Sequence, residues 1–317
     1  MISICIPLYK SSFLKETLTS LNHQDFKNIE VILVNDGDGR DYSEIIAGFP
    51  SLNLKYLIQK NEGAGAARNK AFRHSTGQYI KFLDADDVLS VNHLSEQLKL
   101  ALKYPAAIVS GKWGRFYNND LHTFRLEEES IYKNCEGKEW ITESWLQGPN
   151  MTQPGIFLIP RKLIEEHGLW QPELSKGPCD DMEFFTRMIL NSNGIVFCKG
   201  AILYYRSGNE NNLSGLKSIE SFEWFLETIK RSSEHLLLKS LNHLEAKKAA
   251  ATQFKLLGYK AYPYHKDVSR KAMEEAKRLA DSSYPYPAGG VTQILNQLFG
   301  WRMVIELKKI LGYKKIN

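Results

Sequence analysis

Hydrophobic and polar residues alternate along the N-terminal third of the chain in two different periods. Short apolar runs rich in β-branched residues, typical of strands, are separated by segments with the three-to-four-residue spacing of amphipathic helices. This alternation predicts an α/β fold with a mostly parallel central sheet flanked by helices, in which ligands bind beyond the carboxyl ends of the strands. The predicted strands are residues 2–8, 30–34, 54–58 and 79–83, and the predicted helices are 13–22, 65–74 and 91–102.

The middle of the chain has a weaker pattern. Residues 113–153 are irregular and aromatic, with Trp140 and Trp145 in a predicted amphipathic helix. Residues 155–159 form a further predicted strand, which leads into a short helix that ends near Gly168. We expect the aromatic side chains to pack in the core, with the lining of an acceptor pocket as the alternative.

The C-terminal third is helical. Residues 219–279 carry helical spacing, interrupted near Pro263, and residues 291–317 resemble an amphipathic basic helix. We therefore predict an α/β domain over residues 1–215 and an α-helical extension over residues 216–317.

Composition, charge and cysteine spacing limit the functional classes. With 43% hydrophobic and 24% charged residues, the 317-residue chain has ordinary globular composition, and its net charge of +5 is too small to indicate nucleic-acid binding. The four cysteines are scattered, which predicts reduced thiols and neither a zinc site nor a disulfide framework. No basic leader precedes the first strand, and no window approaches the roughly 18 apolar residues of a membrane span. We therefore expect a cytoplasmic protein.

Three acidic residues directly follow the fourth predicted strand. Asp84, Asp86 and Asp87 repel one another unless a cation lies between them, and carboxylate oxygens suit Mg²⁺ or Mn²⁺ that also holds phosphate. Helix capping is the alternative for Asp84 and Asp86, but Ser90 is better placed to cap the next helix. Asp36 ends the second strand, where a ligand-binding role competes with simple turn formation.

Two further segments carry candidate chemistry. The glycine-rich residues 61–69 enter a helix and would let a ligand approach the backbone. Arg68, in the opening turns of that helix, opposes the helix dipole unless it has an anionic or base-edge partner, which a surface salt bridge would also supply. Asp180 and Glu183 have the spacing of a capping box, which favours a structural role for Asp180.

Asp181 is the candidate general base. It shares a predicted helical face with Phe184, Phe185 and Met188, which places a carboxylate at the edge of an apolar pocket where its proton affinity rises. Such a group can accept the proton of a hydroxyl. The alternative is an ordinary first-turn aspartate that favours the helix dipole. None of the eight histidines has metal-ligand spacing.

These segments, in this order, resemble the inverting family 2 glycosyltransferases with the GT-A fold, a Rossmann-like fold that binds nucleotide-diphospho-sugars. The resemblance covers roughly two-thirds of the chain and leaves the helical extension unexplained. The matching motifs are Ile6-Pro7-Leu8-Tyr9, Val34-Asn35-Asp36-Gly37, Asn61-Glu62-Gly63 to Arg68-Asn69, Phe82-Leu83-Asp84-Ala85-Asp86-Asp87, Gly168-Leu169-Trp170 and Asp180-Asp181.

The resemblance implies an activity: transfer of a sugar from a nucleotide-diphosphate donor, such as a UDP-sugar, to a hydroxyl of a glycan or lipid-linked acceptor with inversion. It implies a nucleotide-sugar-binding half over residues 1–110 and an acceptor and catalytic half over 111–215. Polysaccharide biosynthesis at the cell surface is the expected process.

The resemblance also implies site roles. Asp86 would bind Mn²⁺ or Mg²⁺, Asp181 would be the base, and Trp170 and Asp180 would lie on the acceptor side, with the Trp170 ring stacking on a sugar. The residues implied in nucleotide-sugar binding are Pro7, Tyr9, Asp36, Arg68, Asp84, Ala85 and Asp86.

Three positions depart from the family pattern. Asn35 stands where the family often has an acid, and Asp180 stands where a glutamate is common. No histidine follows Tyr205-Arg206, so metal ligation would fall on Asp86 and phosphate, with Arg206 as a candidate diphosphate contact. The small polar residue that often closes this segment corresponds to Ser214. A degenerate binding module and a nucleotide-sugar pyrophosphorylase remain alternatives, although the latter would need a basic glycine-rich loop after the first strand.

The C-terminal segment indicates a location. From Trp301 onward, basic residues outnumber the single acid Glu306, and apolar residues occupy another side. A helix of this kind can rest on an anionic membrane surface near a lipid-linked acceptor. The alternative is a helix that packs on the protein or on a second copy. The basic residues are Arg302, Lys308, Lys309, Lys314 and Lys315.

Overall fold

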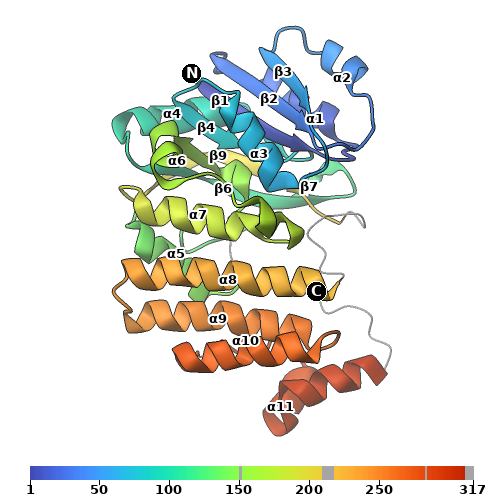
Figure 1. The fold of residues 1–317 in the computed structure, drawn as a ribbon, viewed down its shortest axis with the longest axis vertical. Helices are drawn as coiled ribbons and strands as arrows, with labels where there is room; N and C mark the ends of the chain where they lie inside the picture. The colour runs from blue at the N-terminus through green and yellow to red at the C-terminus, as the bar shows by residue number, and fades with distance from the viewer. Residues whose placement is uncertain (150–151, 209–217, 283, 311–317) are drawn as a thin grey trace.

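The computed structural model describes residues 1–149, 152–208, 218–282 and 284–310. Within these ranges, one mixed sheet has the strand order β3-β2-β1-β4-β8-β6-β9-β5, with β7 paired to β6. Helices flank the sheet, and the C-terminal helices stack in further layers below α7 (Figure 1). The predicted α/β class with a helical extension is confirmed.

The N-terminal half follows the predicted alternation closely. Strands β1 to β4 are parallel, as their hydrophobic runs predicted. The short helix α2 (Ser43–Ala47) and strand β5 (Val88–Leu89) were not predicted. The predicted elements are observed as β1 (Ile2–Leu8), α1 (Leu14–Asn22), β2 (Ile29–Asn35), β3 (Leu54–Ile58), α3 (Ala64–Arg73), β4 (Tyr79–Phe82) and α4 (His93–Lys103).

The middle of the chain is more regular than its sequence indicated. The segment predicted to be irregular contains the hairpin of β6 (Ile108–Tyr117) and β7 (Asp120–Leu126), whose turn has Asn118 and Asn119 in the left-handed region. The long strand β9 (Ile195–Arg206), parallel to β6, was not predicted. The other elements here are α5 (Gly137–Leu146), η1 (Pro154–Ile156), β8 (Phe157–Pro160), α6 (Arg161–His167), η2 (Pro172–Lys176) and α7 (Asp180–Asn191).

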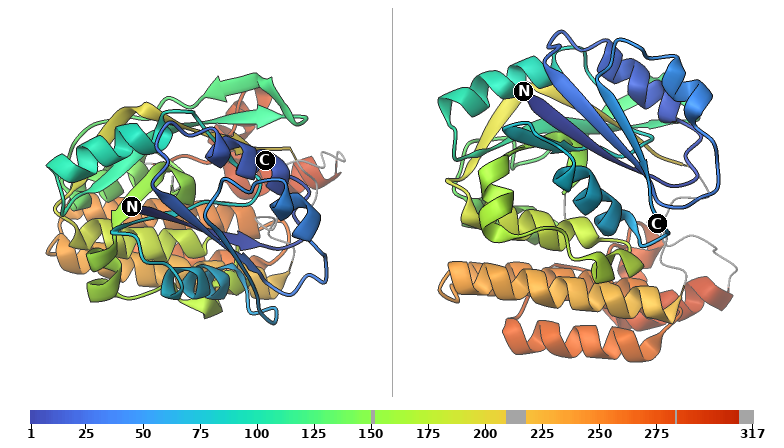
Figure 2. Two further views of the ribbon diagram at one scale, coloured as in Figure 1. Left: turned by 90° about the horizontal axis from the view of Figure 1, so that it is seen from above. Right: turned by 45° about the horizontal axis from the view of Figure 1, so that its top comes forward.

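The helical extension shares the hydrophobic core of the α/β part. Phe222, Ile229 and Phe254 belong to the same buried cluster as Trp140 and Phe184. The predicted interruption near Pro263 is confirmed, because α9 ends at Ala261 and α10 begins at Lys266. A further break, at Leu241 and Asn242, was not predicted, and both residues adopt positive φ. Figure 2 shows the stacked helices from two further directions. The helices are α8 (Ile219–Lys239), α9 (Leu244–Ala261), α10 (Lys266–Leu279) and α11 (Val291–Ile310).

A buried lysine fixes β4 against its antiparallel neighbour β8. The side chain of Lys81 is fully buried, and its ammonium donates to the carbonyls of Gly155 at 2.8 Å and Phe157 at 3.0 Å. It also lies 3.1 Å from His93 Nε2. Burial lowers the pKa of Lys81 to about 7. These contacts hold the strand that leads into the acidic turn at Asp84.

Candidate functional site

The carboxyl ends of three parallel strands form the floor of the site. Leu8 at the end of β1 is level with Asn35 at the end of β2, and β4 runs beside β1 on its other side. The loop after β1 is tied to the acidic turn, because the Ser11 hydroxyl donates to the carbonyl of Ala85 at 2.9 Å. Pro7 and Tyr9, both half-buried, therefore lie at the same sheet edge as that turn.

Asp36 builds the glycine-rich loop before α3. Its carboxylate is buried and accepts bonds from the backbone amides of Glu62 and Gly63, each at 2.9 Å, and from Gln59 at 2.8 Å. Gly37, at φ 72°, lies so close that a Cβ there would come 2.8 Å from the amide nitrogen of Asn61. These contacts show that Asp36 anchors the glycine-rich loop. This role was not among the two predicted for Asp36, ligand binding and turn formation.

Asn35, which departs from the family pattern, is hydrogen-bonded to the neighbouring acid Asp38. Its amide donates to Asp38 at 3.1 Å and to the Tyr56 hydroxyl at 3.0 Å, and its Oδ1 accepts from the Asp38 backbone amide at 3.1 Å. Asp38 also accepts a bond from the Tyr42 hydroxyl at 2.6 Å. Because an aspartate at position 35 would face this carboxylate, the amide is the side chain that fits here.

Arg68 joins the two acidic segments of the site. It is 5% exposed, and its guanidinium lies 2.9 Å from Asp84 and 3.2 Å from Asp180 on α7. Burial alone would lower the pKa of Arg68, but Asp180 and Asp84 raise it above its usual value. The anionic partners expected for a cation near a helix start are therefore present, and they form a buried pairing, unlike the surface salt bridge of the alternative.

The acidic turn after β4 is shaped by Arg206. The Arg206 backbone amide donates to the buried Asp87 at 3.1 Å, its Nε donates to the Asp86 carbonyl at 2.9 Å, and its Nη1 donates to Asn119 on the β6–β7 turn at 2.9 Å. The guanidinium also lies 3.9 Å above the Phe13 ring. Arg206 is only 3% exposed, and these contacts give it a structural role in the turn. Its contact with a diphosphate stays a prediction.

The Asp86 carboxylate remains open to a cation. Burial, with Asp84 nearby, raises the pKa of Asp86 to about 6 against the opposing effect of Arg206. No hydrogen bond or ion pair from a described side chain reaches this carboxylate. In the described part of the chain, no group of three or more histidine, cysteine or acidic residues forms a metal cage. The residues therefore fit a Mg²⁺ or Mn²⁺ ion that takes one carboxylate and completes its shell with phosphate and water.

The start of α7 differs from the predicted capping box. The helix begins at Asp180 with Cys179 at the N-cap and no side-chain cap. Asp180 instead accepts the Ser175 hydroxyl at 2.7 Å and pairs with Arg68. Glu183 cannot reach back to the helix start, because it is fully buried and paired with Arg187.

Asp181 has the raised proton affinity that its sequence position predicted. The carboxyl is half-buried, and burial together with Asp180 raises its pKa to about 7, against the lowering effect of Arg68. The Thr152 hydroxyl donates to its Oδ2 at 3.1 Å. A carboxyl with this pKa can accept a proton from a hydroxyl near neutral pH.

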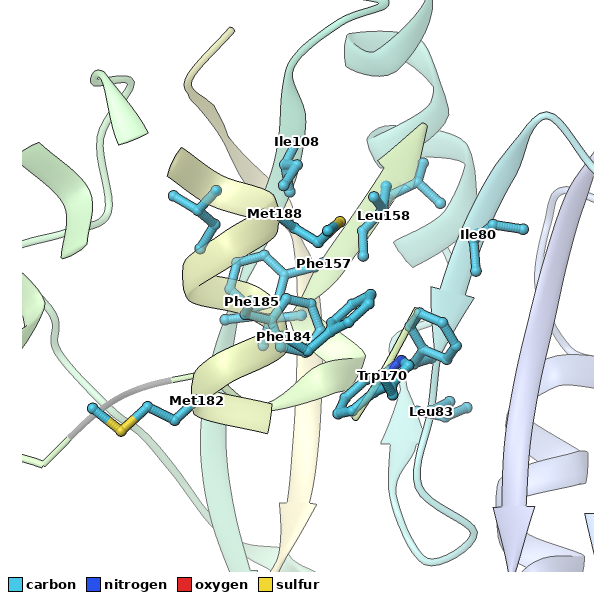
Figure 3. Close-up of a cluster of buried hydrophobic side chains, with 14 of the residues drawn as sticks. Ile80, Leu83, Ile108, Phe157, Leu158, Trp170, Met182, Phe184, Phe185 and Met188 are labelled. Atoms are coloured by element: carbon cyan, nitrogen blue, oxygen red, sulfur yellow. The ribbon is translucent and has the colours of Figure 1, made fainter. Parts of the chain in front are cut away.

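Trp170 is part of the core, which corrects its predicted stacking on a sugar. It is 3% exposed, and its ring stacks on Phe184 with centroids 4.2 Å apart and an interplanar angle of 6° (Figure 3). The Arg68 guanidinium lies 4.3 Å from the ring, and Asn69 binds both backbone groups of Trp170 at 2.9 and 3.0 Å. The ring thus supports Arg68 and has no free face for an acceptor sugar.

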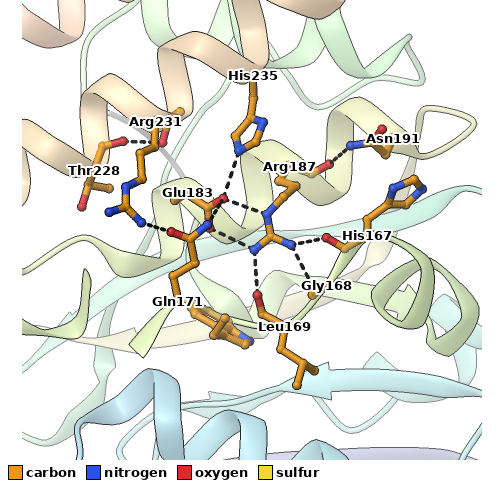
Figure 4. Close-up of polar contacts among 12 residues, drawn as sticks. His167, Gly168, Leu169, Gln171, Glu183, Arg187, Asn191, Thr228, Arg231 and His235 are labelled. Carbon is orange, nitrogen blue, oxygen red and sulfur yellow. Dashed lines mark hydrogen bonds and ion pairs between the residues drawn. The ribbon is translucent and has the colours of Figure 1, made fainter. Parts of the chain in front are cut away.

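A buried ion-pair network behind Trp170 was not found from the sequence. Arg187 pairs with Glu183 at 2.7 Å and donates to the carbonyls of residues 167–169 at 2.6 to 2.8 Å (Figure 4). His235 on α8 lies 3.1 Å from the same carboxylate, and Arg231 bonds to Gln171. The helical extension therefore braces the turn that carries Trp170. The spacing of Glu183 and Arg187, four residues apart on a helix, was the available signal.

Replacing Arg187 with alanine is expected to lower the free energy of unfolding by about 3–5 kcal/mol, because the buried Glu183 loses its main partner. Urea denaturation measures this effect. Arg270→Ala is a matched control, since its ion pair with Glu274 is exposed and should contribute less than about 1 kcal/mol. Equal losses in the two variants would contradict the role of Arg187.

Comparison with known proteins identifies the family. The family model described as "Glycosyl transferase family 2" matches residues 3–168, about half of the chain. The chain belongs to glycosyl transferase family 2. This membership and the GT-A fold agree with the resemblance seen in the sequence.

Relatives of this family 2 protein include larger enzymes. It is 24% identical to Glycosyltransferase GlyA of Streptococcus pneumoniae over 242 residues. This alignment covers 75% of this chain and 34% of GlyA. It is also 24% identical to Putative glycosyltransferase EpsH of Bacillus subtilis over 209 residues, and this alignment covers 65% of this chain and 60% of EpsH. The chain thus spans about a third of the length of GlyA.

Solved structures share the fold of this family 2 protein. S. aureus TarS residues 1–349 superpose with a TM-score of 0.66 at 18% identity, covering 98% of this chain and 91% of TarS 1–349. The same TarS fragment in complex with UDP-GlcNAc gives a TM-score of 0.62 at 17% identity, covering 91% of this chain and 99% of that fragment.

Among the described residues, no helix is long and apolar enough to cross a membrane.

Proposed function

We propose that this family 2 protein transfers a sugar from a nucleotide-diphosphate donor to an acceptor hydroxyl with inversion at the anomeric carbon. The observation that carries the proposal is Asp181, a half-buried carboxyl with a pKa of about 7. Arg68 pairs with both Asp84 and Asp180, so the start of α7 lies beside the acidic turn at the sheet edge. The proposed base, Asp181, and the acidic turn proposed to bind the diphosphate through a cation therefore lie in one site.

In the proposed reaction, Asp181 accepts the proton of the acceptor hydroxyl as the hydroxyl oxygen attacks the anomeric carbon, and the bond to the diphosphate breaks. The Thr152 hydroxyl orients the Asp181 carboxylate through its hydrogen bond. Arg68 holds Asp84 in place for the predicted contact with the ribose. A divalent cation at Asp86, Mn²⁺ or Mg²⁺, would neutralise the diphosphate as it leaves.

UDP-sugars are the proposed donors. Support comes from the TarS structures, whose titles record complexes with UDP-GlcNAc and with UDP. We propose that residues 1–110 form the donor half and residues 111–215 the acceptor half, because the acidic turn lies in the first and Asp181 in the second. Residues 216–317 form the proposed extension.

The proposed acceptor is a glycan or a lipid-linked saccharide of cell-surface polysaccharide synthesis, with the reaction taking place in the cytoplasm. Support comes from the match with family 2 and from the basic C-terminal segment. For a lipid-linked acceptor, the enzyme would work at the inner face of the membrane.

Release of nucleoside diphosphate from a panel of nucleotide sugars tests the proposal. Each donor is incubated with the protein and Mn²⁺, Mg²⁺ or a chelator. Metal-dependent turnover of one donor is the expected result, and hydrolysis of the donor by water is sufficient when the acceptor is unknown. Folded protein that binds a donor without any turnover would instead be a degenerate nucleotide-sugar-binding module.

A further inference from the structure

Helix α11 presents apolar side chains to solvent on both sides of a kink. Its two helical pieces meet at Gly300, whose φ of 76° and ψ of 162° are not helical. In the first piece, Val291, Ile294 and Leu298 are 72%, 58% and 67% exposed. Their spacing of three and four residues places them on one face of the helix. Nothing in the described part of the chain covers this face.

The second piece is attached to the protein by its other side. Val304 and Ile305 are buried with Tyr259 and Tyr286, and Glu306 pairs with Lys266 at 2.9 Å. The packing helix that the sequence left as an alternative is therefore present on this side.

The outer side of this second piece is again apolar. Met303 is 47% exposed and Ile310 is 79% exposed, and their separation of seven residues places them on one face. Two apolar outer faces thus follow one another in a segment that is attached to the protein through the small cluster of Val304, Ile305, Tyr259 and Tyr286.

Charge decides between the candidate occupants of these faces. Residues 291–317 contain five basic residues and one acid, a net charge of +4, and the acid already pairs with Lys266. A two-fold dimer through α11 would bring two such segments together, so that like charges repel. An anionic lipid surface complements both the cations and the apolar side chains. Lys314 and Lys315 lie outside the described residues and contribute here only as sequence.

We propose that α11 docks on the surface of an anionic phospholipid bilayer. The outer faces of its two pieces enter the headgroup region, and Arg302 and Lys309, both exposed, contact lipid phosphates. The helix lies on the membrane and does not cross it. The proposal goes beyond the transferase reaction, and its test does not use activity.

Vesicle flotation of the full chain tests the docking. Vesicles of phosphatidylcholine alone are compared with vesicles of equal parts phosphatidylcholine and phosphatidylglycerol. We expect flotation with the anionic vesicles only. The variant I294E/L298E should bind at least about tenfold more weakly, because two exposed apolar side chains that would enter the bilayer are lost. Arg302→Glu with Lys309→Glu should also weaken binding and remove its salt dependence.

Leu238→Glu is the matched control, because Leu238 is 74% exposed but lies at the far end of α8. Its flotation should equal that of the wild type. Equal flotation of I294E/L298E and wild type, or no flotation of the wild type, would overturn the proposal. Light scattering adds a further outcome: a wild-type dimer that I294E/L298E converts to a monomer would show that a second copy covers this face.

Discussion

Asp181→Asn is expected to reduce kcat by about three orders of magnitude, since the acceptor hydroxyl loses the group that takes its proton. Asparagine keeps the size of the side chain and its bond with Thr152, so donor binding should be unchanged. Steady-state kinetics with the donor found by the release assay measures the loss, and titration of UDP measures binding. A variant that keeps wild-type kcat would remove Asp181 from the mechanism.

The pH dependence of the wild type follows from the same group. Asp181 is active when ionised, and burial and Asp180 raise its pKa to about 7. Therefore kcat/KM should be high above pH 7 and fall about tenfold per unit as the pH drops below it. The Asp181→Asn variant should lack this limb. A wild-type profile that is flat from pH 5 to 8 would contradict the assignment.

Stability should move in the opposite direction to activity. The carboxyl of Asp181 binds its proton more tightly in the folded state than in the unfolded state, so the free energy of unfolding falls as the pH rises from about 4 to about 7. Asparagine has no charge to bury, and Asp181→Asn should be about 2 kcal/mol more stable at pH 8. The gain should vanish near pH 4. Such a result would also show that the inactive variant is folded.

Asp86→Ala is expected to lower metal-supported turnover by at least about a hundredfold, because the carboxylate proposed to hold the cation is removed. Its binding of Mn²⁺ in the presence of UDP, followed by the paramagnetic signal of the ion, should weaken in parallel. Asp267→Ala is the control, since this carboxylate is 87% exposed on α10. Metal-dependent turnover that persists in Asp86→Ala would place the cation elsewhere.

The predicted parts of the fold are those whose hydrophobic pattern is local. Strands β1, β2 and β4 are mostly apolar because both of their faces are buried in the sheet, whereas β3 at the sheet edge is partly exposed. The β6–β7 hairpin was missed because β7 is largely exposed, with residues such as Leu121 and Arg125 facing solvent, and so lacks a core-facing apolar pattern. Strand β9 was missed although its β-branched and aromatic residues carry a local strand pattern. Its place beside β6 in the sheet joins distant segments, which no local pattern encodes.

The candidate site shows the same division. The raised proton affinity of Asp181 was predicted from its apolar surroundings, and burial is its first cause, but the further effect of the Asp180 carboxylate was not part of that prediction. The pairing of Arg68 with Asp180 and of Asn69 with Trp170 could not be predicted, since these partners are 112 and 101 residues apart in the sequence. The family resemblance implied that the Trp170 ring stacks on a sugar, but in the folded protein this ring stacks on Phe184.

Lys81 offers a chemical reporter on the integrity of the sheet. Because a pKa of about 7 leaves much of its amine unprotonated at neutral pH, burial is what protects Lys81 from an acylating reagent. Covalent labelling of Lys81 would then require β4 and β8 to separate. Its modification rate, read by mass spectrometry, would measure how often the strand that carries the acidic turn opens, while the surface lysines react at once.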